Sequence, residues 1–368
     1  MPGNILVGRY LNNLKLINKL IQDLQKISAG MQVCCFGEIL LRFSPQLHGK
    51  FIAQASMPVY IGGAELNVAT ALARWNIAAK YVTAVPANYL AEEMISEVSK
   101  RNINIEGIKF CGERIGSYYL PQGADLKNSG VIYDRANSSF ANLKPGDLDW
   151  DTILQNVDWF HFSAISPALN PSAAAVCLEA VQAASKKNIP ISVDLNYRAK
   201  LWQYGKVPLE IMPEIVQYCS LIMGNIWSAE KLLGIKLAAD FNPDSTNKAA
   251  FLQQAQLSAQ GIRQKFSGCQ TIANTFRFDE GEGIKYFATM HTKDADLNSL
   301  SYAIKTIVDK IGSGDCFMAG LIYGIRQNLS EQNILDFATA AAIGKLQQLG
   351  DATTSKIDDI QKIIAANG

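Results

Sequence analysis

From residue 31 onward, short apolar segments alternate with segments whose apolar residues recur at helical spacing. The apolar segments predict strands at Val33–Phe36, Tyr81–Val85, Trp159–Ser163, Pro190–Leu195, Ser220–Met223 and Thr271–Phe276. The helical spacing predicts helices at Ala64–Trp75, Ala91–Arg101, Ser172–Lys186 and Ala249–Lys265, one ending at Leu233, and three near Gly314–Gln327, Glu331–Gln348 and Ile357–Ala366. Strands that alternate with helices are typical of an α/β fold in which helices cover both faces of a mostly parallel sheet.

Two β-rich stretches interrupt this alternation, because no helix separates their strands. The first contains strand candidates Leu40–Phe43 and Pro58–Ile61, and the second contains Ile115–Leu120 and Gly130–Arg135. They predict a small separate sheet, a lid formed by about 38–61 and 114–137. A lid on an α/β body makes a cleft that can close and exclude water.

The first thirty residues stand apart from the rest of the chain, which we expect to form one domain from residue 31 to residue 368. Apolar residues such as Leu14, Ile17 and Leu24 recur there at helical spacing, with lysines in the same segment. Two interpretations of residues 1–30 stay open: an appended amphipathic helix, or a start assigned upstream of the true one at Met31. The interrupted apolar pattern argues against a secretory signal.

The composition limits the classes of protein that remain. Of 368 residues, 48% are hydrophobic and 18% are charged, which is ample for a large core. Lys plus Arg (34) nearly balances Asp plus Glu (33), so we expect neither nucleic acid nor a membrane as a partner. Seven cysteines without CxxC spacing favour a reduced, cytoplasmic location, and three widely separated histidines argue against a zinc site. No apolar run has the length of a transmembrane helix.

The segment Asp309-Lys-Ile-Gly-Ser-Gly-Asp315 joins an apolar run to a predicted helix. Its glycines let the backbone come close to a ligand. A helix that begins near Gly314 directs free N–H groups and the positive end of its dipole at that point, which suits an anion. Asp315 lies in the first turn, where it could accept a proton from a nucleophile. Taken alone, the segment fits an ordinary glycine turn equally well.

A second glycine-rich segment, Gly62-Gly63-Ala64-Glu65-Leu66-Asn67, ends a predicted strand and opens a predicted helix. A ligand hydroxyl could approach the backbone closely at the two glycines. Asn67 would face the same side one helical turn later. By itself, this segment favours a simple strand-to-helix turn.

Together, the early Gly-Gly-Ala-x-x-Asn-x-Ala and the late Asp-x-x-Gly-x-Gly-Asp resemble the two signatures of the PfkB, or ribokinase-like, sugar kinases, over about 33–364. The resemblance implies a ribokinase-like α/β fold with a β lid. It also implies that Asp315 is the general base that deprotonates the sugar hydroxyl and that Asp309 opens the turn. Gly312, Ser313 and Gly314 would form an anion hole for the transferred phosphate. Phosphoryl transfer depends on positioning and charge neutralisation more than on covalent chemistry, which suits such a site.

Within this family the chain most resembles the 2-keto-3-deoxygluconate kinases. The matching segments are Phe36–Glu38 with Leu41–Pro45, Tyr133–Arg135, and Asp194–Arg198 followed by Leu201-Trp202. This resemblance implies ATP-dependent phosphorylation of 2-keto-3-deoxy-D-gluconate at its terminal hydroxyl, giving the 6-phosphate and ADP. The residues implied to hold the sugar acid are Gly63, Asn67, Tyr118, Tyr133, Arg135 and Arg198. Two arginines suit a substrate carboxylate; the alternatives are a solvated lid charge for Arg135 and a capping or ion-pair role for Arg198.

The resemblance further implies ATP as cosubstrate, Mg²⁺ carried with the nucleotide, and room for a monovalent cation. The residues implied to contact the nucleotide are Asn196, Asn225, Thr275, Arg277, Gly312 and Gly314. Two departures leave the metal ligands unassigned. Ser228 stands where the family's Asn-x-x-Glu motif has Glu, and Asn274–Asp279 replaces the usual glycine-rich nucleotide loop. Lys310 and Ser313 also replace a usual Thr and a usual Ala.

Two other functions stay open. One keeps the chemistry and changes the substrate to fructose or another sugar. The other is a sugar or nucleotide sensor without catalytic activity, against which the intact Asp315 argues. The expected lid strands have exposed edges, so we predict a homodimer or higher homo-oligomer that pairs through the lid.

Overall fold

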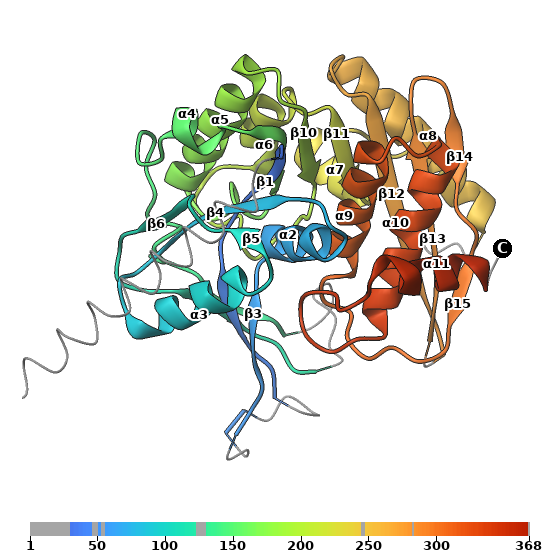
Figure 1. Ribbon diagram of the computed structural model, residues 1–368. Helices are drawn as coiled ribbons and strands as arrows, with labels where there is room; N and C mark the ends of the chain where they lie inside the picture. The colour runs from blue at the N-terminus through green and yellow to red at the C-terminus, as the bar shows by residue number, and fades with distance from the viewer. Residues whose placement is uncertain are drawn as a thin grey trace, which may run out of the picture.

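The computed structural model describes residues 30–45, 51–52, 56–122, 130–243, 247–281 and 283–366 of the chain. They form a large sheet of eleven strands, packed between helices, and a small sheet of four strands (Figure 1). The helix expected in the first thirty residues lies outside the described residues. So do parts of the expected lid segments, at 46–50, 53–55 and 123–129.

The large sheet is parallel over most of its width, as the alternation of strands and helices predicts. In spatial order it contains β14 (Asp296–Asn298), β13 (Gly283–His291), β12 (Thr271–Glu280), β11 (Leu221–Gly224), β10 (Ile191–Asp194), β9 (Val157–Ser163), β1 (Gln32–Phe36), β4 (Ala79–Val85) and β5 (Ile103–Asn104). In addition, β6 (Ile108–Phe110) pairs with β4, and β15 (Tyr302–Ile304) pairs with β13. The pairings from β6 and β5 to β12 are parallel, whereas β13 is antiparallel to its three neighbours.

Successive side chains of the central strands enter two different cores. In β1, Val33 and Cys35 belong to the core on one face of the sheet, and Cys34 and Phe36 belong to the core on the other. Strands that are apolar on both faces are typical of a parallel sheet between two helical layers.

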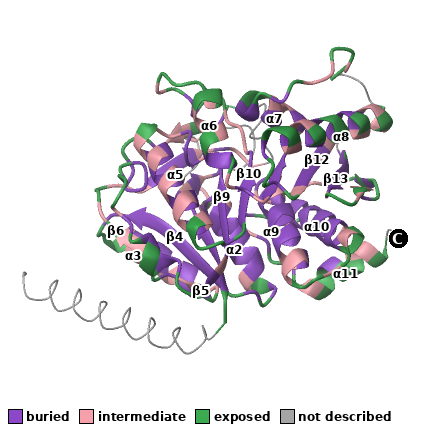
Figure 2. Ribbon diagram, turned by 90° about the horizontal axis from the view of Figure 1, so that it is seen from above, coloured by how far each residue is buried: buried purple, intermediate pink, exposed green. Residues whose placement is uncertain are grey.

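Two layers of helices cover these faces (Figure 2). The layer over Val33 contains α2 (Ala64–Arg74), α3 (Tyr89–Ser99), α9 (Ser313–Arg326), α10 (Glu331–Leu346) and α11 (Ile357–Ala365). The layer over Phe36 contains α4 (Trp150–Ile153), α5 (Pro171–Lys186), α6 (Pro208–Val216), α7 (Ile226–Leu233) and α8 (Lys248–Lys265). The expected fold class, a mostly parallel sheet flanked by helices with a small separate sheet, is confirmed.

The small sheet forms from the two β-rich stretches of the sequence. Its strand order is β3 (Val59–Gly62), β2 (Leu40–Phe43), β7 (Gly116–Tyr119) and β8 (Ile132–Asp134). Strands β2 and β7 pair in parallel, and each pairs antiparallel with its outer neighbour. We call this sheet the lid; β3 extends below the body in Figure 1.

The structure corrects the expectation of a loop at Thr275–Asp279, the segment that stands in place of the family's glycine-rich nucleotide loop, and extends the strand expected at Thr271–Phe276. Residues Thr271–Glu280 form one continuous strand, β12, which pairs along its whole length with β13. The sequence pattern missed β13 because a strand that returns from its neighbour through a hairpin has no helix before it to mark its start. Phe276 stacks on Phe287 with ring centroids 4.9 Å apart, and such cross-strand aromatic pairs stabilise a hairpin. The strands β5, β6 and β14 and the helices α4 and α6 were also not predicted.

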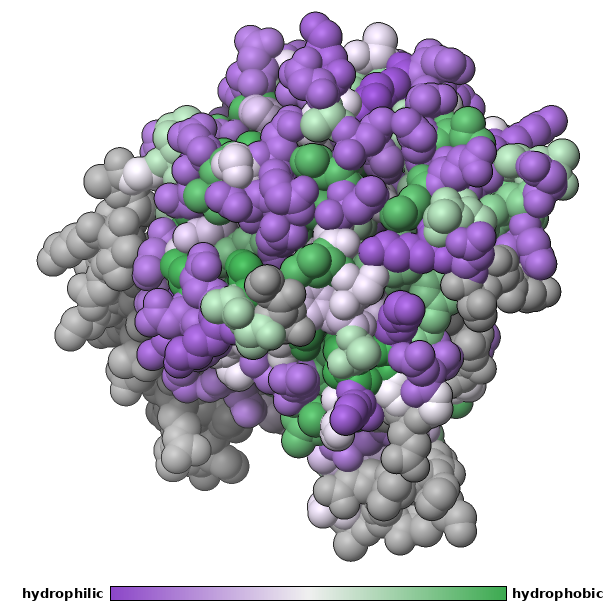
Figure 3. Space-filling view, turned by 90° about the vertical axis from the view of Figure 1, so that its right-hand side faces the viewer, coloured by the Kyte–Doolittle hydropathy of each residue, from purple (hydrophilic) through white to green (hydrophobic). Residues whose placement is uncertain are grey.

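The visible surface is mostly polar. On the face seen in Figure 3, hydrophilic side chains cover most of the area and hydrophobic ones lie scattered among them. Among the described residues, no helix is both long and apolar enough to cross a membrane.

Candidate active site

The turn before α9 has the geometry that its glycines predict. Gly312 is the N-cap of α9 and adopts the left-handed conformation, with φ of 78°. A Cβ atom there would lie 1.9 Å from the backbone oxygen of Asp351, so only glycine fits at this position. The free N–H groups of the first helical turn, beginning at Ser313, lie next to the glycine. This turn therefore offers backbone donors and the positive end of a helix dipole to an anion.

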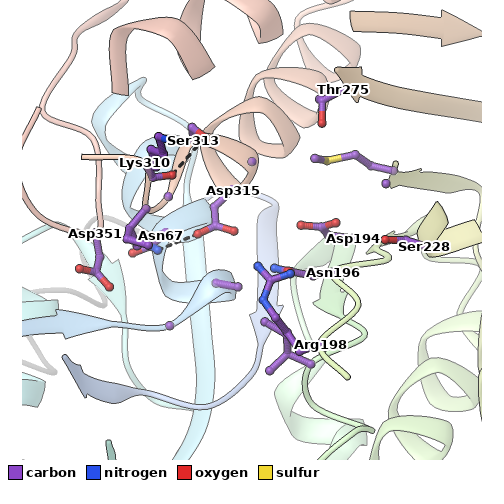
Figure 4. Close-up of a pocket in the computed structure, with 18 of the residues that line it drawn as sticks. Asn67, Asp194, Asn196, Arg198, Ser228, Thr275, Lys310, Ser313, Asp315 and Asp351 are labelled. Atoms are coloured by element: carbon purple, nitrogen blue, oxygen red, sulfur yellow. Dashed lines mark hydrogen bonds between the residues drawn. The ribbon is translucent and has the colours of Figure 1, made fainter. Parts of the chain in front are cut away.

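The two glycine-rich segments meet at Asp315. Asn67, in the first turns of α2, donates a hydrogen bond from Nδ2 to Asp315 Oδ2 at 2.7 Å (Figure 4). Gly63, the N-cap of α2, has φ of 138°, and a Cβ atom on it would lie 2.6 Å from the backbone oxygen of Glu38. The backbone at Gly63, where α2 begins, therefore lies close to the backbone at Glu38, where the lid begins.

Two buried carboxyl groups face the same space in Figure 4: Asp315 from α9 and Asp194 from the end of β10. Burial raises the pKa of Asp315 to about 8, opposed by the hydrogen bond from Asn67, and the charge of Asp194 raises it further. Burial also raises the pKa of Asp194 to about 7, opposed by the charge of Arg198. Carboxyl groups with pKa values near neutrality in a pocket are typical of catalytic sites.

One pocket brings together all the residues that the sequence analysis expected to bind substrate or nucleotide or to act in catalysis, whereas Asp309, which opens the turn, is not part of its lining. Its lining includes Gly63, Asn67, Tyr118, Tyr133, Arg135, Asn196, Arg198, Asn225, Thr275, Arg277, Gly312, Ser313, Gly314 and Asp315. These residues come from the lid, from both motif helices, and from the carboxyl ends of the central strands. In open α/β sheets this is the edge at which ligands bind. The roles of the individual residues stay predictions.

The two arginines expected to hold a sugar acid differ in their surroundings. Arg135 is 5% exposed, and its Nε donates to Glu38 Oε2 at 2.6 Å, so it is a buried ion-pair residue and not a solvated lid charge. Arg198 donates from Nη1 to the backbone oxygen of Tyr197 at 2.9 Å. No carboxylate of the described residues lies in an ion pair with Arg198, and its buried Nε has no hydrogen-bond partner among them.

The residues expected to contact a nucleotide lie in part at the ends of β11 and β12. Asn225 caps α7 by accepting a hydrogen bond from the Ser228 backbone N–H at 2.8 Å. Thr275 and Arg277 extend from β12, which lies beside β11 in the sheet. Across the pocket, Lys310 of the glycine-rich turn pairs with Asp279 of β12, with Nζ and Oδ1 3.6 Å apart.

Among the described residues, no group of three or more His, Cys, Asp and Glu side chains forms a protein-only metal cage. The pocket lining does include side-chain oxygens, those of the Asp194 carboxylate and of the Asn196 and Asn225 amides. One carboxylate with neutral oxygen ligands and substrate phosphates is the usual protein environment of Mg²⁺. The donor set therefore fits a nucleotide-bound magnesium ion.

Several pocket residues received no role from the sequence. Asp194 was only part of a matched segment, although its place at the end of a buried strand was a signal. Asp351 follows α10 without any motif around it. Its carboxylate accepts a hydrogen bond from the Tyr118 hydroxyl at 2.7 Å and pairs with Arg42 at 2.8 Å. Local patterns carry no information about contacts between residues so far apart in the chain.

The chain is similar in sequence and fold to several known sugar kinases. The solved 2-dehydro-3-deoxygluconokinase of Thermotoga maritima is similar to this chain, with 34% identity and a TM-score of 0.81 over 91% of this chain and 99% of that one. The 2-dehydro-3-deoxygalactonokinase of Haloferax volcanii is 30% identical over 171 residues, 46% of this chain and 54% of that kinase, so the match spans about half of that protein. The probable chloroplastic fructokinase-6 of Arabidopsis thaliana is 25% identical over 302 residues, 81% of this chain and 71% of that protein.

The sequence profile of the pfkB family carbohydrate kinases matches residues 31–267 and 281–358, which is most of the chain. The two matched stretches contain both glycine-rich segments, the lid strands and all the residues that line the pocket except Thr275 and Arg277. The chain therefore belongs to the pfkB family and is a carbohydrate kinase.

Proposed function

We propose that this kinase transfers the γ-phosphoryl group of ATP to the terminal hydroxyl of 2-keto-3-deoxy-D-gluconate, also called 2-dehydro-3-deoxygluconate. The observation that carries the reaction is the Asn67–Asp315 hydrogen bond beside the Gly312 turn. It places a carboxylate of raised pKa next to backbone donors at a helix N-terminus. A base and an anion hole so arranged meet the two needs of phosphoryl transfer.

In the proposed mechanism, Asp315 takes the proton of the sugar hydroxyl as its oxygen attacks the γ-phosphorus. A new oxygen–phosphorus bond forms, the bond from the γ-phosphorus to the bridging oxygen breaks, and ADP leaves with that oxygen. The N–H groups at Ser313 and Gly314 stabilise the negative charge on the transferred group. Asn67 keeps the carboxylate of Asp315 directed at the hydroxyl through its hydrogen bond.

Asp194, Asn196 and Asn225 would hold magnesium with the nucleotide phosphates. When bound, the ion neutralises negative charge that develops between the β- and γ-phosphates. Lys310 and Arg277 bring two further positive charges to the same side of the pocket. The pairing of Lys310 with Asp279 keeps the lysine close to β12, where the phosphates would lie.

The sugar-acid assignment rests on Arg198 and on the similarity to the Thermotoga maritima kinase. Arg198 is a pocket cation without a carboxylate in ion-pair contact among the described residues, so its guanidinium is able to pair with a substrate carboxylate. Tyr118 and Tyr133, whose ring centroids are 6.4 Å apart, would cover the sugar from the lid.

A substrate panel tests the proposal. The purified protein is assayed for ADP release with 2-keto-3-deoxygluconate, 2-keto-3-deoxygalactonate, fructose and ribose, each with ATP and magnesium. We expect the highest kcat/KM with 2-keto-3-deoxygluconate. Higher kcat/KM with fructose would make the protein a fructokinase, as the similarity to fructokinase-6 allows. Ligand binding without turnover of any sugar would favour the sensor.

A further inference from the structure

The lid reaches into the phosphate-binding turn through one buried side chain. Arg42, on lid strand β2, is fully buried, with 0% of its surface exposed. Its guanidinium bridges two carboxylates: Nη2 lies 2.7 Å from Asp309 Oδ2, and Nε lies 2.8 Å from Asp351 Oδ1. The same guanidinium lies over the ring of Tyr60, on the next lid strand, 4.5 Å from its centroid. Arg42 is thus held by the lid and holds two residues of the body.

Both carboxylate residues define the shape of the turn. Asp309 opens the turn, and its Oδ1 accepts a hydrogen bond from the Ile311 backbone N–H at 3.1 Å. The backbone oxygen of Asp351 stands 1.9 Å from the place where a Gly312 Cβ would lie, so Asp351 packs directly against the turn. Moving either residue would move the backbone N–H groups that follow Gly312.

A second lid strand acts on the same residue. The hydroxyl of Tyr118, on β7, donates to Asp351 Oδ2 at 2.7 Å, and Tyr118 is 6% exposed. The two lid strands therefore contact both oxygens of the Asp351 carboxylate, Tyr118 through a hydrogen bond to Oδ2 and Arg42 through an ion pair with Oδ1. Asp351 itself belongs to the body of the protein and packs beside Gly312.

The charges in this cluster balance each other. Lys345, near the end of α10, is also fully buried, and its Nζ donates to the backbone oxygen of Gln348 at 3.1 Å. Burial lowers the pKa of Lys345, and the charges of Asp309 and Asp351 oppose this shift. Two cations and two carboxylates are thus buried together. Withdrawing the lid cation would leave two buried carboxylates with one cation, which is costly.

We propose that Arg42 is a positioning residue for phosphoryl transfer: by holding Asp309 and Asp351, it couples the position of the lid to the shape of the Gly312–Gly314 anion hole. The proposal rests on the proposed function only in assigning the turn to the transferred phosphoryl group. The backbone donors of the turn are then correctly placed when β2 is docked on the body. Closure of the lid over the substrate and correct placement of the anion-hole N–H groups would then occur together.

The test compares Arg42→Lys with wild type, using whichever sugar the wild-type protein phosphorylates fastest. Lysine keeps the charge but cannot span two carboxylates as a planar guanidinium does. Because small misplacements of catalytic groups can cost about 10²-fold in rate, we expect kcat to fall at least about tenfold while KM for the sugar changes less than about threefold. The matched control is Arg114→Lys, which alters a half-exposed lid ion pair with Asp134 (2.7 Å) and should leave kcat unchanged.

A binding measurement separates this proposal from the choice of substrate. Calorimetry measures the affinity for MgADP with and without aluminium fluoride, which mimics the transferred phosphoryl group. Wild type should bind more tightly with fluoride, and Arg42→Lys should lose most of that gain while binding MgADP alone equally well. If Arg42→Lys fails to fold, Asp351→Asn serves instead, because it removes one of the two ion pairs of Arg42 and keeps an acceptor for Tyr118.

The possible outcomes test the role of Arg42 and the choice of substrate separately. A fall in melting temperature with unchanged kcat and unchanged fluoride-dependent gain would reduce Arg42 to a structural role and overturn the proposal. A wild-type protein without any fluoride-dependent gain would overturn it as well. Failure to phosphorylate 2-keto-3-deoxygluconate, with transfer to another sugar, would overturn the proposed substrate and leave the coupling of lid and turn supported by the same comparison.

Discussion

Asp315 has the environment that a base for phosphoryl transfer needs, because its proton affinity is raised while its carboxylate keeps one hydrogen-bond donor. Burial sets the pKa at about 8, and Asn67 limits the rise. A base is most effective when its pKa lies near the working pH, since it is then partly ionised and still strongly basic. Asp194 adds to this effect at a distance, because its negative charge opposes ionisation of Asp315.

Replacing Asp315 tests the base and its titration together. We expect Asp315→Asn to lower kcat by about 10²- to 10⁴-fold, the usual contribution of a general base, and to change sugar affinity little. Only ionised Asp315 can accept the proton, so wild-type kcat/KM should rise with pH and level off above about 8. The residual activity of the variant should lack this rise. Stopped assays from pH 6 to 9 measure both; near-normal turnover of Asp315→Asn would remove the residue from its role.

Substitutions of the two pocket arginines should have different effects, one on substrate binding and the other on stability. Arg198→Gln removes the cation without an ion-pair partner, so KM for a sugar acid should rise about 10- to 100-fold, the range of a charge-assisted hydrogen bond, with a smaller change for a neutral sugar. Arg135→Gln should instead lower the melting temperature, because it leaves buried Glu38 without its cation. Equal KM effects on acidic and neutral sugars would contradict a carboxylate contact at Arg198.

At the scale of elements, the site depends on how α9 begins. Gly312→Ala should disrupt the turn, because its φ of 78° disfavours any side chain and Asp351 leaves no space for a Cβ. Gly314→Ala is the matched control: its Cβ would meet only Met223 Cε, at 3.8 Å. We expect loss of activity and a lower melting temperature for Gly312→Ala, and a wild-type melting temperature for Gly314→Ala. Similar melting temperatures for the two variants would contradict the strain argument.

The elements that the sequence predicted well are those with a local signal. The glycine turns, the helices after them and the buried parallel strands all follow from periodicity and composition within one segment. The long hairpin of β12 and β13 has no such signal, because its stability comes from pairing, such as Phe276 on Phe287. The roles of Arg42 and Asp351 could not be predicted for the same reason, because their contacts join segments far apart in the chain.

At the scale of the whole molecule, the lid is joined to the body at the site itself. Arg42 and Tyr118 link lid strands to Asp351, and Arg42 also links β2 to Asp309. Under the proposed function, contacts at the base of the lid therefore reach both the part of the pocket assigned to the sugar and the part assigned to the phosphates. A change in lid position would then alter the surroundings of both proposed substrates. Such coupling suits an enzyme that must exclude water from a phosphoryl group.

The outer parts of the lid leave two edge strands, β3 and β8, which carry exposed apolar residues. Val59 on β3 is 49% exposed and Ile132 on β8 is 58% exposed. Open edges with apolar side chains favour pairing with another chain, so we expect two lids to associate in a homodimer. Light scattering should give twice the mass of one chain. Ile132→Lys should shift this mass toward the monomer, because it places a charge in the contact.

The control for this experiment is Val207→Lys, an equally exposed apolar position (57%) at the start of α6, outside the lid. It should leave the mass unchanged. If lid pairing also holds β2 and β7 on the body, Ile132→Lys should lower kcat as the dimer dissociates, and raising the protein concentration should restore both mass and kcat together. A monomeric wild-type protein, or dissociation by Val207→Lys but not by Ile132→Lys, would place the contact elsewhere.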